Sequence, residues 1–350
     1  MKPYFESNGT RIFHGDCREV LRNLPDESVN CCVTSPPYWG LRDYGVEGQM
    51  GLESTPDEYV TQMVSVFREV KRVLRDDGTL WLNMGDCYNQ GNKGQSGEMN
   101  PSYKQASNVG SLGTRRGPML GSNRNRNHEG MKPKDLVGMP WLLAFALRAD
   151  GWYLRQDIIW SKANPMPESV TDRCTKAHEY IFLLSKKERY YYNQEAISEP
   201  CAFGDRGSSF ISEQDVLTKP NLGNGKRTIK VPGGWDRGNG AHGTIHREGR
   251  TSAEYQEAEV SDTRNRRSVW TVATQAFPDA HFATFPEDLI KPCILAGCPE
   301  GGTVLDPFMG SGTTALVARN NHCKAIGVEL NADYIEIAAK RLSQEVLNFG

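Results

Sequence analysis

"GGTVLDPFMGSGTTALVARNNHCKAIGVEL", residues 301–330, contains two short apolar runs with a glycine-rich loop and a helical pattern between them. The runs at 301–306 and 324–330 predict two strands, and the segment from 314 onward predicts the helix that joins them. A strand, a glycine-rich turn, a helix and a second strand form one half of a doubly wound parallel sheet. The sequence therefore predicts an α/β fold with a ligand site at the carboxyl ends of these strands.

The loop "GSGTTA" (310–315) fits the pattern G-x-G-x-x-A, in which small residues let the backbone approach a ligand closely. Asp306 precedes the loop, and Glu329 lies at the end of the next predicted strand, where an acid can accept hydrogen bonds from ribose hydroxyls. An ATP-binding P-loop is excluded because no lysine follows the second glycine. This motif alone leaves open NAD, S-adenosylmethionine and a tight turn without a ligand.

Apolar periodicity extends the alternation of strands and helices toward the N-terminus. Thr55, Pro56 and Glu58 predict a capped helix with proline at its first position. Its apolar face extends to Leu74, and Gly78 is predicted to follow its end. The other predicted strands cover 29–34, 79–84, 157–162 and 178–186, and the other predicted helices cover 136–151 and 331–347.

A second motif, "TSPPY" (34–38), follows the predicted strand at 29–34. Its two prolines lack N–H groups and fix φ, so the carbonyls of Ser35 and Pro36 can act as acceptors in a stiff arrangement. Together with the Ser35 hydroxyl they can hold an NH₂ group, and the ring of Tyr38 can stack on a flat heterocycle. Such a pocket suits the exocyclic amine of a nucleobase that is flipped out of a duplex. The alternative interpretation is a rigid turn with ordinary core aromatics.

These two motifs resemble those of the DNA amino-methyltransferases, which move a methyl group from S-adenosylmethionine to cytosine N4 or adenine N6. "TSPPY" is similar to the family's target-base loop, and "DPFMGSGTT" (306–314) is similar to its cofactor loop. The order, with the catalytic loop first and the cofactor loop near the C-terminus, resembles the β class. The resemblance implies a Rossmann-like methyltransferase sheet that is circularly permuted and carries a polar target-recognition insertion.

The resemblance also implies roles for individual residues. Ser35, Pro36, Pro37 and Tyr38 would form the catalytic loop. Asp16 would contact the adenine of S-adenosylmethionine. Phe285 and Pro286, in the segment "HFATFPEDLIKPC" (281–293) that precedes the cofactor strand, would line its methionine end. The full set implied in cofactor binding is Asp16, Cys17, Thr34, Phe285, Pro286, Asp306, Phe308, Gly310, Ser311, Gly312, Thr313 and Glu329.

Ser35 at the first position of the tetrapeptide resembles the cytosine-N4 enzymes, whereas aspartate there resembles most adenine-N6 enzymes. N4-cytosine is therefore favoured, with N6-adenine as the alternative, and transfer would be direct and in line. Methylation at cytosine C5 needs a cysteine nucleophile after a proline, and neither Pro200-Cys201 nor Pro292-Cys293 follows a strand in the expected place. A catalytically silent nucleotide-binding or nucleic-acid-binding module, and a methyltransferase of RNA or small amines, also remain open.

The net charge of −2 does not by itself indicate a nucleic-acid partner. The basic residues are unevenly distributed, however, with eight Lys and Arg against three acids between 91 and 135. That loop, and the region 195–269 in which the family's target-recognition region lies, are predicted to contact double-stranded DNA. The predicted DNA-binding residues are Arg115, Arg116, Arg124, Arg126, Arg264, Arg266 and Arg267.

The predicted organisation is a catalytic half at 1–87 and 136–194 that a basic loop at 88–135 interrupts, then the target-recognition region at 195–269 and a cofactor-binding half at 270–350. No apolar run approaches the ~20 residues that cross a bilayer, so no membrane association is expected. The nine cysteines lack a CxxC pair, which argues against a metal site and a disulfide framework and favours the cytoplasm. The sequence leaves open a cognate restriction endonuclease and a homodimer.

Overall fold

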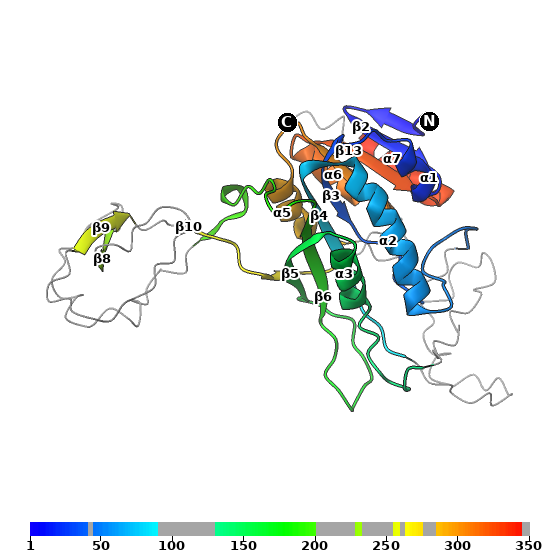
Figure 1. The fold of residues 1–350 in the computed structure, drawn as a ribbon, viewed down its shortest axis with the longest axis horizontal. Helices are drawn as coiled ribbons and strands as arrows, with labels where there is room; N and C mark the ends of the chain where they lie inside the picture. Colours follow the sequence, from blue (N-terminus) through cyan, green and yellow to red (C-terminus); the bar gives the residue numbers. More distant parts are fainter. Residues whose placement is uncertain are drawn as a thin grey trace. The chain divides into compact units, whose positions relative to one another are not determined.

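The computed structural model describes the following residues: 1–40, 45–89, 130–200, 228–232, 255–259, 263–275 and 285–344. They belong to two compact units. One unit consists of Met1–Ala196 together with Arg267–Gly350, and the other is Ile197–Arg266. The first unit contains both motifs singled out in the sequence, and Figure 1 shows its sheet with helices packed against it.

The first unit is built on a mixed sheet in which nine of the described strands lie in the order β1-β2-β13-β12-β3-β4-β6-β5-β11. Neighbouring strands from β2 to β4 are parallel, whereas β6 is antiparallel to both β4 and β5. The C-terminal strands β12 and β13 lie between the N-terminal strands β2 and β3, which confirms the permuted α/β sheet. The bounds are β1 Phe5–Ser7, β2 Thr10–His14, β3 Val29–Thr34, β4 Leu74–Met84, β5 Tyr153–Lys162, β6 His178–Ser185, β11 Val269–Val272, β12 Thr303–Asp306 and β13 Lys324–Glu329.

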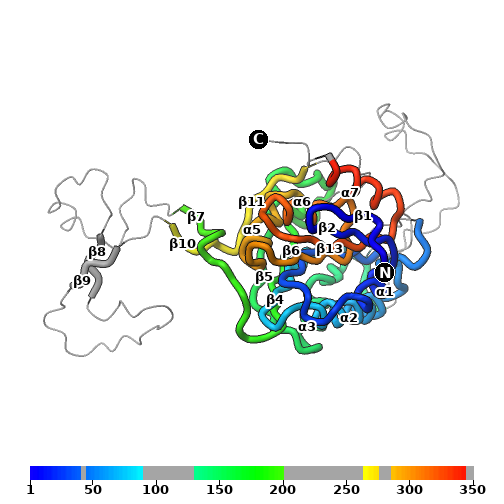
Figure 2. Tube along the Cα trace, turned by 90° about the horizontal axis from the view of Figure 1, so that it is seen from above, coloured from blue at the N-terminus to red at the C-terminus, as the bar shows by residue number. Residues whose placement is uncertain are grey.

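Helices cover both faces of this sheet. Helix α2 packs against α1 and α3 on one face, and α6 packs against α5 and α7 on the other. The view in Figure 2 shows α2 and α3 on one side of the strands and α6 and α7 on the opposite side. The bounds are α1 Cys17–Arg22, α2 Pro56–Val73, α3 Met139–Ala149, α5 Glu287–Gly297, α6 Thr313–Asn320 and α7 Ala332–Gln344.

Helix α2 begins where the sequence predicts and ends earlier. The Thr55 side chain accepts a hydrogen bond from the Glu58 backbone at 3.1 Å, and the Glu58 carboxylate accepts one from the Thr55 backbone at 3.3 Å, which completes the capping box. Leu74, predicted as part of the helix, instead starts β4 and pairs with Val29. β3 and β4 pair irregularly between the Val29–Leu74 and Cys31–Thr79 pairs, and Gly78 lies in that stretch of β4 rather than directly at the end of the helix.

The second unit contains two short antiparallel pairs of strands within its described residues. β8 (Thr228–Pro232) pairs with β9 (Tyr255–Glu259), and β7 (Glu199–Pro200) pairs with β10 (Thr263–Arg264). The sequence predicts few elements here because the segment is polar and rich in glycine.

Candidate active site

The carboxyl ends of four neighbouring strands carry the residues singled out in the sequence. β2, β13, β12 and β3 are parallel neighbours and end at His14, Glu329, Asp306 and Thr34. Carboxyl ends of parallel strands lie at the same edge of a sheet. The Ser-Pro-Pro-Tyr motif and the glycine loop therefore meet at one edge, although they lie near opposite ends of the chain.

Asp306 links these two motifs. Its carboxylate accepts hydrogen bonds from the Thr34 hydroxyl at 2.6 Å, the Thr314 hydroxyl at 2.6 Å and the Phe308 backbone at 3.0 Å. The side chain is buried, and burial raises the pKa of Asp306 to about 6, although the three hydrogen bonds favour the charged form. Asp306 therefore fastens the glycine loop to the strand that leads into the catalytic loop.

This buried carboxyl predicts a pH dependence of stability. The pKa of Asp306 is about 6 in the folded chain and 3.8 in its ordinary state. Between these values the folded state binds a proton that the unfolded state has lost, so the free energy of unfolding falls as the pH rises from about 4 to about 6. At about 1.4 kcal/mol per pKa unit, we expect a loss of about 3 kcal/mol from this group.

Urea unfolding of the wild type and of Asp306→Asn, at pH 4.5 and pH 7.5, measures this contribution. Asparagine does not ionise, so the variant is expected to lose less stability between the two pH values than the wild type. An equal loss of stability in both proteins would show that Asp306 does not cause the pH dependence.

The glycine loop closes against the end of β13. Gly310 and Gly312 have positive φ values of 54° and 85°, a backbone conformation that favours glycine. The Gly310 backbone donates to the Glu329 carboxylate at 2.8 Å, and the Asn331 backbone donates to its other oxygen at 2.7 Å. Burial raises the pKa of Glu329 above its usual value. Ser311 is 1% exposed, and its hydroxyl has no hydrogen-bond partner among the described residues.

Asp16 and Cys17 lie just after β2, at the same edge. Asp16 caps α1, accepts from the Arg18 backbone at 2.8 Å and pairs with the Arg18 guanidinium. Burial alone would raise the pKa of Asp16, but the hydrogen bonds from Arg18 lower it overall. The Cys17 thiol lies in the hydrophobic core, where burial raises its pKa to about 12.

The other predicted cofactor residues flank the helices α5 and α6. Pro286 is buried and caps α5, and Phe285 before it is half-buried. Thr313 is the first residue of α6, and its hydroxyl accepts a hydrogen bond from Arg341 at 3.0 Å. Of "HFATFPEDLIKPC", the predicted methionine-end segment, 281–284 lie outside the described residues.

The Ser-Pro-Pro-Tyr loop is held from several sides. The Tyr59 hydroxyl of α2 donates to the Pro37 carbonyl at 2.9 Å, and the Trp39 indole donates to the Glu53 carbonyl at 2.9 Å. Pro36 itself is buried. The loop therefore has a fixed path out of β3, as the paired prolines predict.

The Tyr38 side chain is the centre of a polar network that the sequence does not reveal. Its hydroxyl donates to the Glu179 carboxylate at 2.8 Å, lies 3.2 Å from the Asn83 side-chain oxygen, and accepts from the Ser35 hydroxyl at 3.3 Å. Burial and the neighbouring Glu179 raise the pKa of Tyr38 well above its usual value. A Cβ atom on Gly85 would lie 2.7 Å from the ring, so glycine there leaves the space that the ring occupies.

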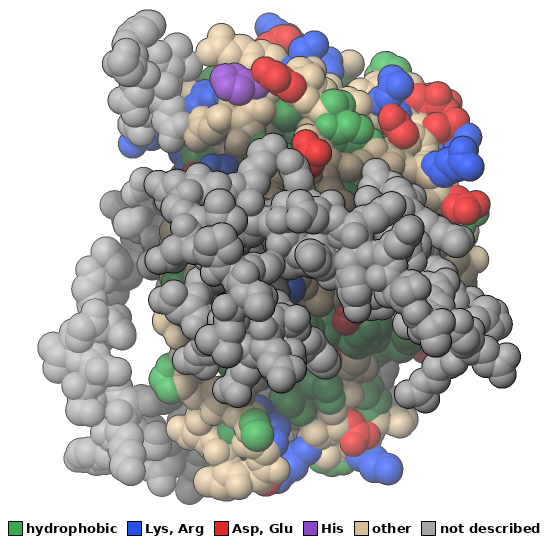
Figure 3. All heavy atoms as spheres, turned by 90° about the vertical axis from the view of Figure 1, so that its left-hand side faces the viewer, with side chains coloured by type: hydrophobic (Ala, Val, Ile, Leu, Met, Phe, Trp, Pro, Cys, Tyr) green, Lys and Arg blue, Asp and Glu red, His purple; other side chains and the backbone are tan. Residues whose placement is uncertain are grey.

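Three of the seven arginines predicted to bind DNA belong to the described residues. Arg115, Arg116, Arg124 and Arg126 lie outside the described residues. Arg264 pairs with Glu199 at 2.9 Å inside the second unit, Arg266 is half-buried, and Arg267 is exposed. On the face drawn in Figure 3, the coloured acidic and basic side chains are interspersed.

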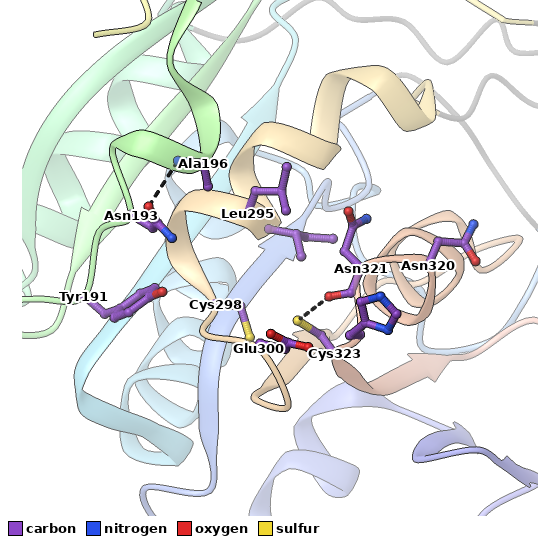
Figure 4. A pocket seen from close by; sticks show the side chains of 11 residues that line it. Tyr191, Asn193, Ala196, Leu295, Cys298, Glu300, Asn320, Asn321 and Cys323 are labelled. Atoms are coloured by element: carbon purple, nitrogen blue, oxygen red, sulfur yellow. Dashed lines mark hydrogen bonds between the residues drawn. The ribbon is translucent and has the colours of Figure 1, made fainter.

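A pocket lies at the opposite edge of the sheet, near the amino ends of β12 and β13 (Figure 4). Cys298 and Glu300 precede β12, and Asn321 and Cys323 precede β13. The described cysteines are free thiols, and the described residues contain no cluster of His, Cys, Asp and Glu suited to hold a metal ion. This pocket is therefore separate from the two motifs.

None of the helices in the described part of the chain combines the length and apolar character of a bilayer span.

A family model described as DNA methylase, of the N6/N4 methyltransferase type, matches residues 29–340. Type II methyltransferase M.Cfr9I of Citrobacter freundii is 44% identical over 343 residues, which cover 98% of this chain and 91% of that protein. Type II methyltransferase M.SmaI of Serratia marcescens is 41% identical over 339 residues, which cover 96% of this chain and 92% of that protein.

A solved structure, PvuII DNA methyltransferase (cytosine-N4-specific), superimposes with a TM-score of 0.58 at 17% identity and covers 97% of this chain and 88% of that one. At this identity the likeness shows the fold. The match to the family model extends over both motifs, and the structure brings them to one edge of a permuted sheet. The chain belongs to the N6/N4 family of DNA amino-methyltransferases, in its β class, and its cofactor is S-adenosylmethionine.

Proposed function

We propose that this DNA methyltransferase acts on the exocyclic N4 of cytosine in duplex DNA. The observation that carries the proposal is Ser35, a neutral hydroxyl at the first position of the tetrapeptide, which donates to the Tyr38 hydroxyl. Serine at this position resembles the cytosine-N4 enzymes, whereas aspartate resembles most adenine-N6 enzymes. The structure named PvuII DNA methyltransferase, which has the same fold, is described as cytosine-N4-specific.

The cofactor loop fits S-adenosylmethionine. Each oxygen of the Glu329 carboxylate accepts one backbone N–H and retains a lone pair, so it can also accept from ribose hydroxyls. The buried Ser311 hydroxyl has no described partner and offers a further polar contact. Glu329 and the 310–313 loop would hold the cofactor, which supplies a methyl group already activated by a sulfonium.

The catalytic loop would prepare the base. The amine is a weak nucleophile because its lone pair is delocalised into the ring. Acceptance of its N–H groups by the Ser35 oxygen and the Pro36 carbonyl would draw the nitrogen toward tetrahedral geometry and expose the lone pair. Tyr38 would stack on the flipped base, which is worth about 1–3 kcal/mol. Bound S-adenosylmethionine would supply its methyl group to that lone pair and leave as the neutral thioether S-adenosylhomocysteine, and the methylated nitrogen would lose a proton to water.

Most of the rate enhancement in this mechanism comes from alignment of the two reactants. Holding them in a near-attack geometry can supply about 7–11 kcal/mol without a covalent enzyme intermediate. The rigid loop after β3 and the linkage through Asp306 provide that alignment, because they fix the catalytic loop and the cofactor loop to each other.

We assign DNA recognition to the segment 195–269 and to the basic loop 88–135. Arg264, Arg266 and Arg267 are the described candidates for phosphate contacts. The local excess of basic residues between 91 and 135 supports the assignment of the loop, and the resemblance to the family supports that of 195–269.

Mass spectrometry of modified nucleosides tests the proposal. The purified protein is incubated with S-adenosylmethionine and unmethylated duplex DNA of varied sequence, and the DNA is then digested to nucleosides. We expect N4-methylcytosine, absent when the cofactor is omitted. N6-methyladenine would overturn the assignment of the base while retaining the enzyme class. The absence of any methylated base would contradict activity on DNA.

A further inference from the structure

We infer that Glu179 is a positioning residue of the catalytic loop: through Tyr38 it orients the Ser35 hydroxyl so that the serine oxygen faces the target base as an acceptor. The inference rests on the proposed function and deepens it, because it names what makes the pocket select an amino group. Glu179 lies on β6, far in sequence from the Ser-Pro-Pro-Tyr motif.

The direction of the hydrogen bonds follows from the chemistry of the carboxylate. An ionised carboxylate only accepts, so the Tyr38 hydrogen points to Glu179 along the 2.8 Å contact. The Tyr38 oxygen keeps its lone pairs, and the Ser35 hydroxyl donates to it at 3.3 Å. The hydrogen of Ser35 is thereby directed away from the base. Toward a ligand, the Ser35 oxygen can therefore only accept hydrogen bonds, through its remaining lone pairs.

This arrangement discriminates between bases by whether the group that faces Ser35 donates or accepts a hydrogen bond. The amine of cytosine or adenine donates N–H groups, which the Ser35 oxygen can accept. A carbonyl in the same place, as in thymine or guanine, would face an acceptor with another acceptor. A buried polar group left unpaired in this way is strongly disfavoured. The hydroxyl network therefore excludes bases that carry oxygen at this position.

Glu179 is itself rigidly held. Lys162 of β5 donates to its carboxylate at 2.5 Å, and the Asn83 side chain of β4 lies 3.4 Å from it. The side chains of Glu179 and Lys162 are only 15% and 22% exposed. Asn83 is fixed in turn by the Tyr180 carbonyl at 3.1 Å. The anchor is thus built on three neighbouring strands rather than on a loop, which is what a precise positioning device requires.

A double-mutant cycle tests whether Glu179 acts through Tyr38. The variants are Glu179→Gln, Tyr38→Phe and the combination, and the measured quantity is the single-turnover rate of methyl transfer into duplex DNA that the wild type methylates. We expect each single variant to be about 10- to 100-fold slower, since each loses a charge-assisted hydrogen bond. The combination is expected to be no slower than the slower single variant.

The matched control is Glu69→Gln on α2, whose carboxylate pairs with Arg72 away from this edge. It is expected to transfer methyl groups at the wild-type rate. The KM for S-adenosylmethionine is expected to stay within about twofold of the wild type in all variants, because the network does not touch the cofactor loop. A Glu179→Gln rate equal to the wild type, or a combined loss equal to the product of the single losses, would overturn the inference.

A binding measurement isolates the selection of the amine. The probes are unmethylated duplexes of the sequence that the wild type methylates. They carry either cytosine or uracil at the target position, each opposite an abasic site so that both bases are equally easy to flip. We expect the wild type to bind the cytosine duplex at least about tenfold more tightly, and Glu179→Gln to lose most of that preference. A preference that Glu179→Gln retains would refute the positioning role and leave the proposed function intact, whereas a wild type that methylates no DNA refutes both.

Discussion

Replacing Ser35 by alanine is expected to slow methyl transfer by at least about 100-fold, because the target amine then loses the acceptor that the serine oxygen provides. The substitution leaves no buried donor unpaired. The Tyr38 hydroxyl still donates to Glu179 at 2.8 Å, so its ring remains in place. We therefore expect the folded structure and the affinity for S-adenosylmethionine to be retained.

Single-turnover transfer of a labelled methyl group to duplex DNA, with calorimetric titration of the cofactor, measures the two quantities separately. Ser65→Ala is the matched control, because Ser65 is exposed on α2 and its hydroxyl donates only to the Gln62 carbonyl of the same helix. A Ser35→Ala enzyme with the rate of the control would remove Ser35 from the catalytic machinery.

Replacing Glu329 by alanine is expected to raise the Kd for S-adenosylmethionine by about 10- to 100-fold. The carboxylate lies at the end of β13 and would offer its free lone pairs to the ribose, and hydrogen bonds to a charged group contribute about 1.5–3 kcal/mol. Glu329→Gln, which keeps one carbonyl oxygen, is expected to have a smaller effect. Saturating cofactor should restore most of the rate in both variants.

Calorimetric titration of the cofactor measures the change, with Glu336→Ala as the control, since Glu336 is an exposed acid on α7. Equal affinities for the cofactor in Glu329→Ala and the control would show that the ribose contact lies elsewhere. A loss of rate that saturating cofactor does not restore would instead point to a role in the transfer step.

The parts of the fold that could be predicted from the sequence are those whose signals are local. The capping box at Thr55 and Glu58 predicts the start of α2, and the apolar runs around the glycine loop predict β12 and β13. Each of the two site motifs is a single continuous stretch of sequence, so its residues could be predicted without the structure. Their meeting at one edge follows from the rule for parallel strands.

The remaining features depend on contacts between distant segments. Leu74 joins β4 rather than α2 because it pairs with Val29, and no local pattern encodes that pairing. Glu179 reaches Tyr38 across 141 residues of chain. The segment "HEYIFLLSK" signals a strand, but the apolar run alone does not say that its second residue faces the catalytic loop. The helices α1 and α5 are also absent from the sequence prediction.

The insertion of β12 and β13 between β2 and β3 has a consequence for synthesis of the chain. β2 and β3 are translated early, whereas their partners β13 and β12 are translated near the end of the chain. Until then both expose unpaired backbone edges, which are prone to pair with other chains. The nascent chain also lacks the hydrogen bond between Thr34 and Asp306, which joins residues 272 positions apart. An incomplete chain lacks the strands that carry Asp306 and Glu329, so we expect it to transfer no methyl groups until β13 has been translated and inserted into the sheet.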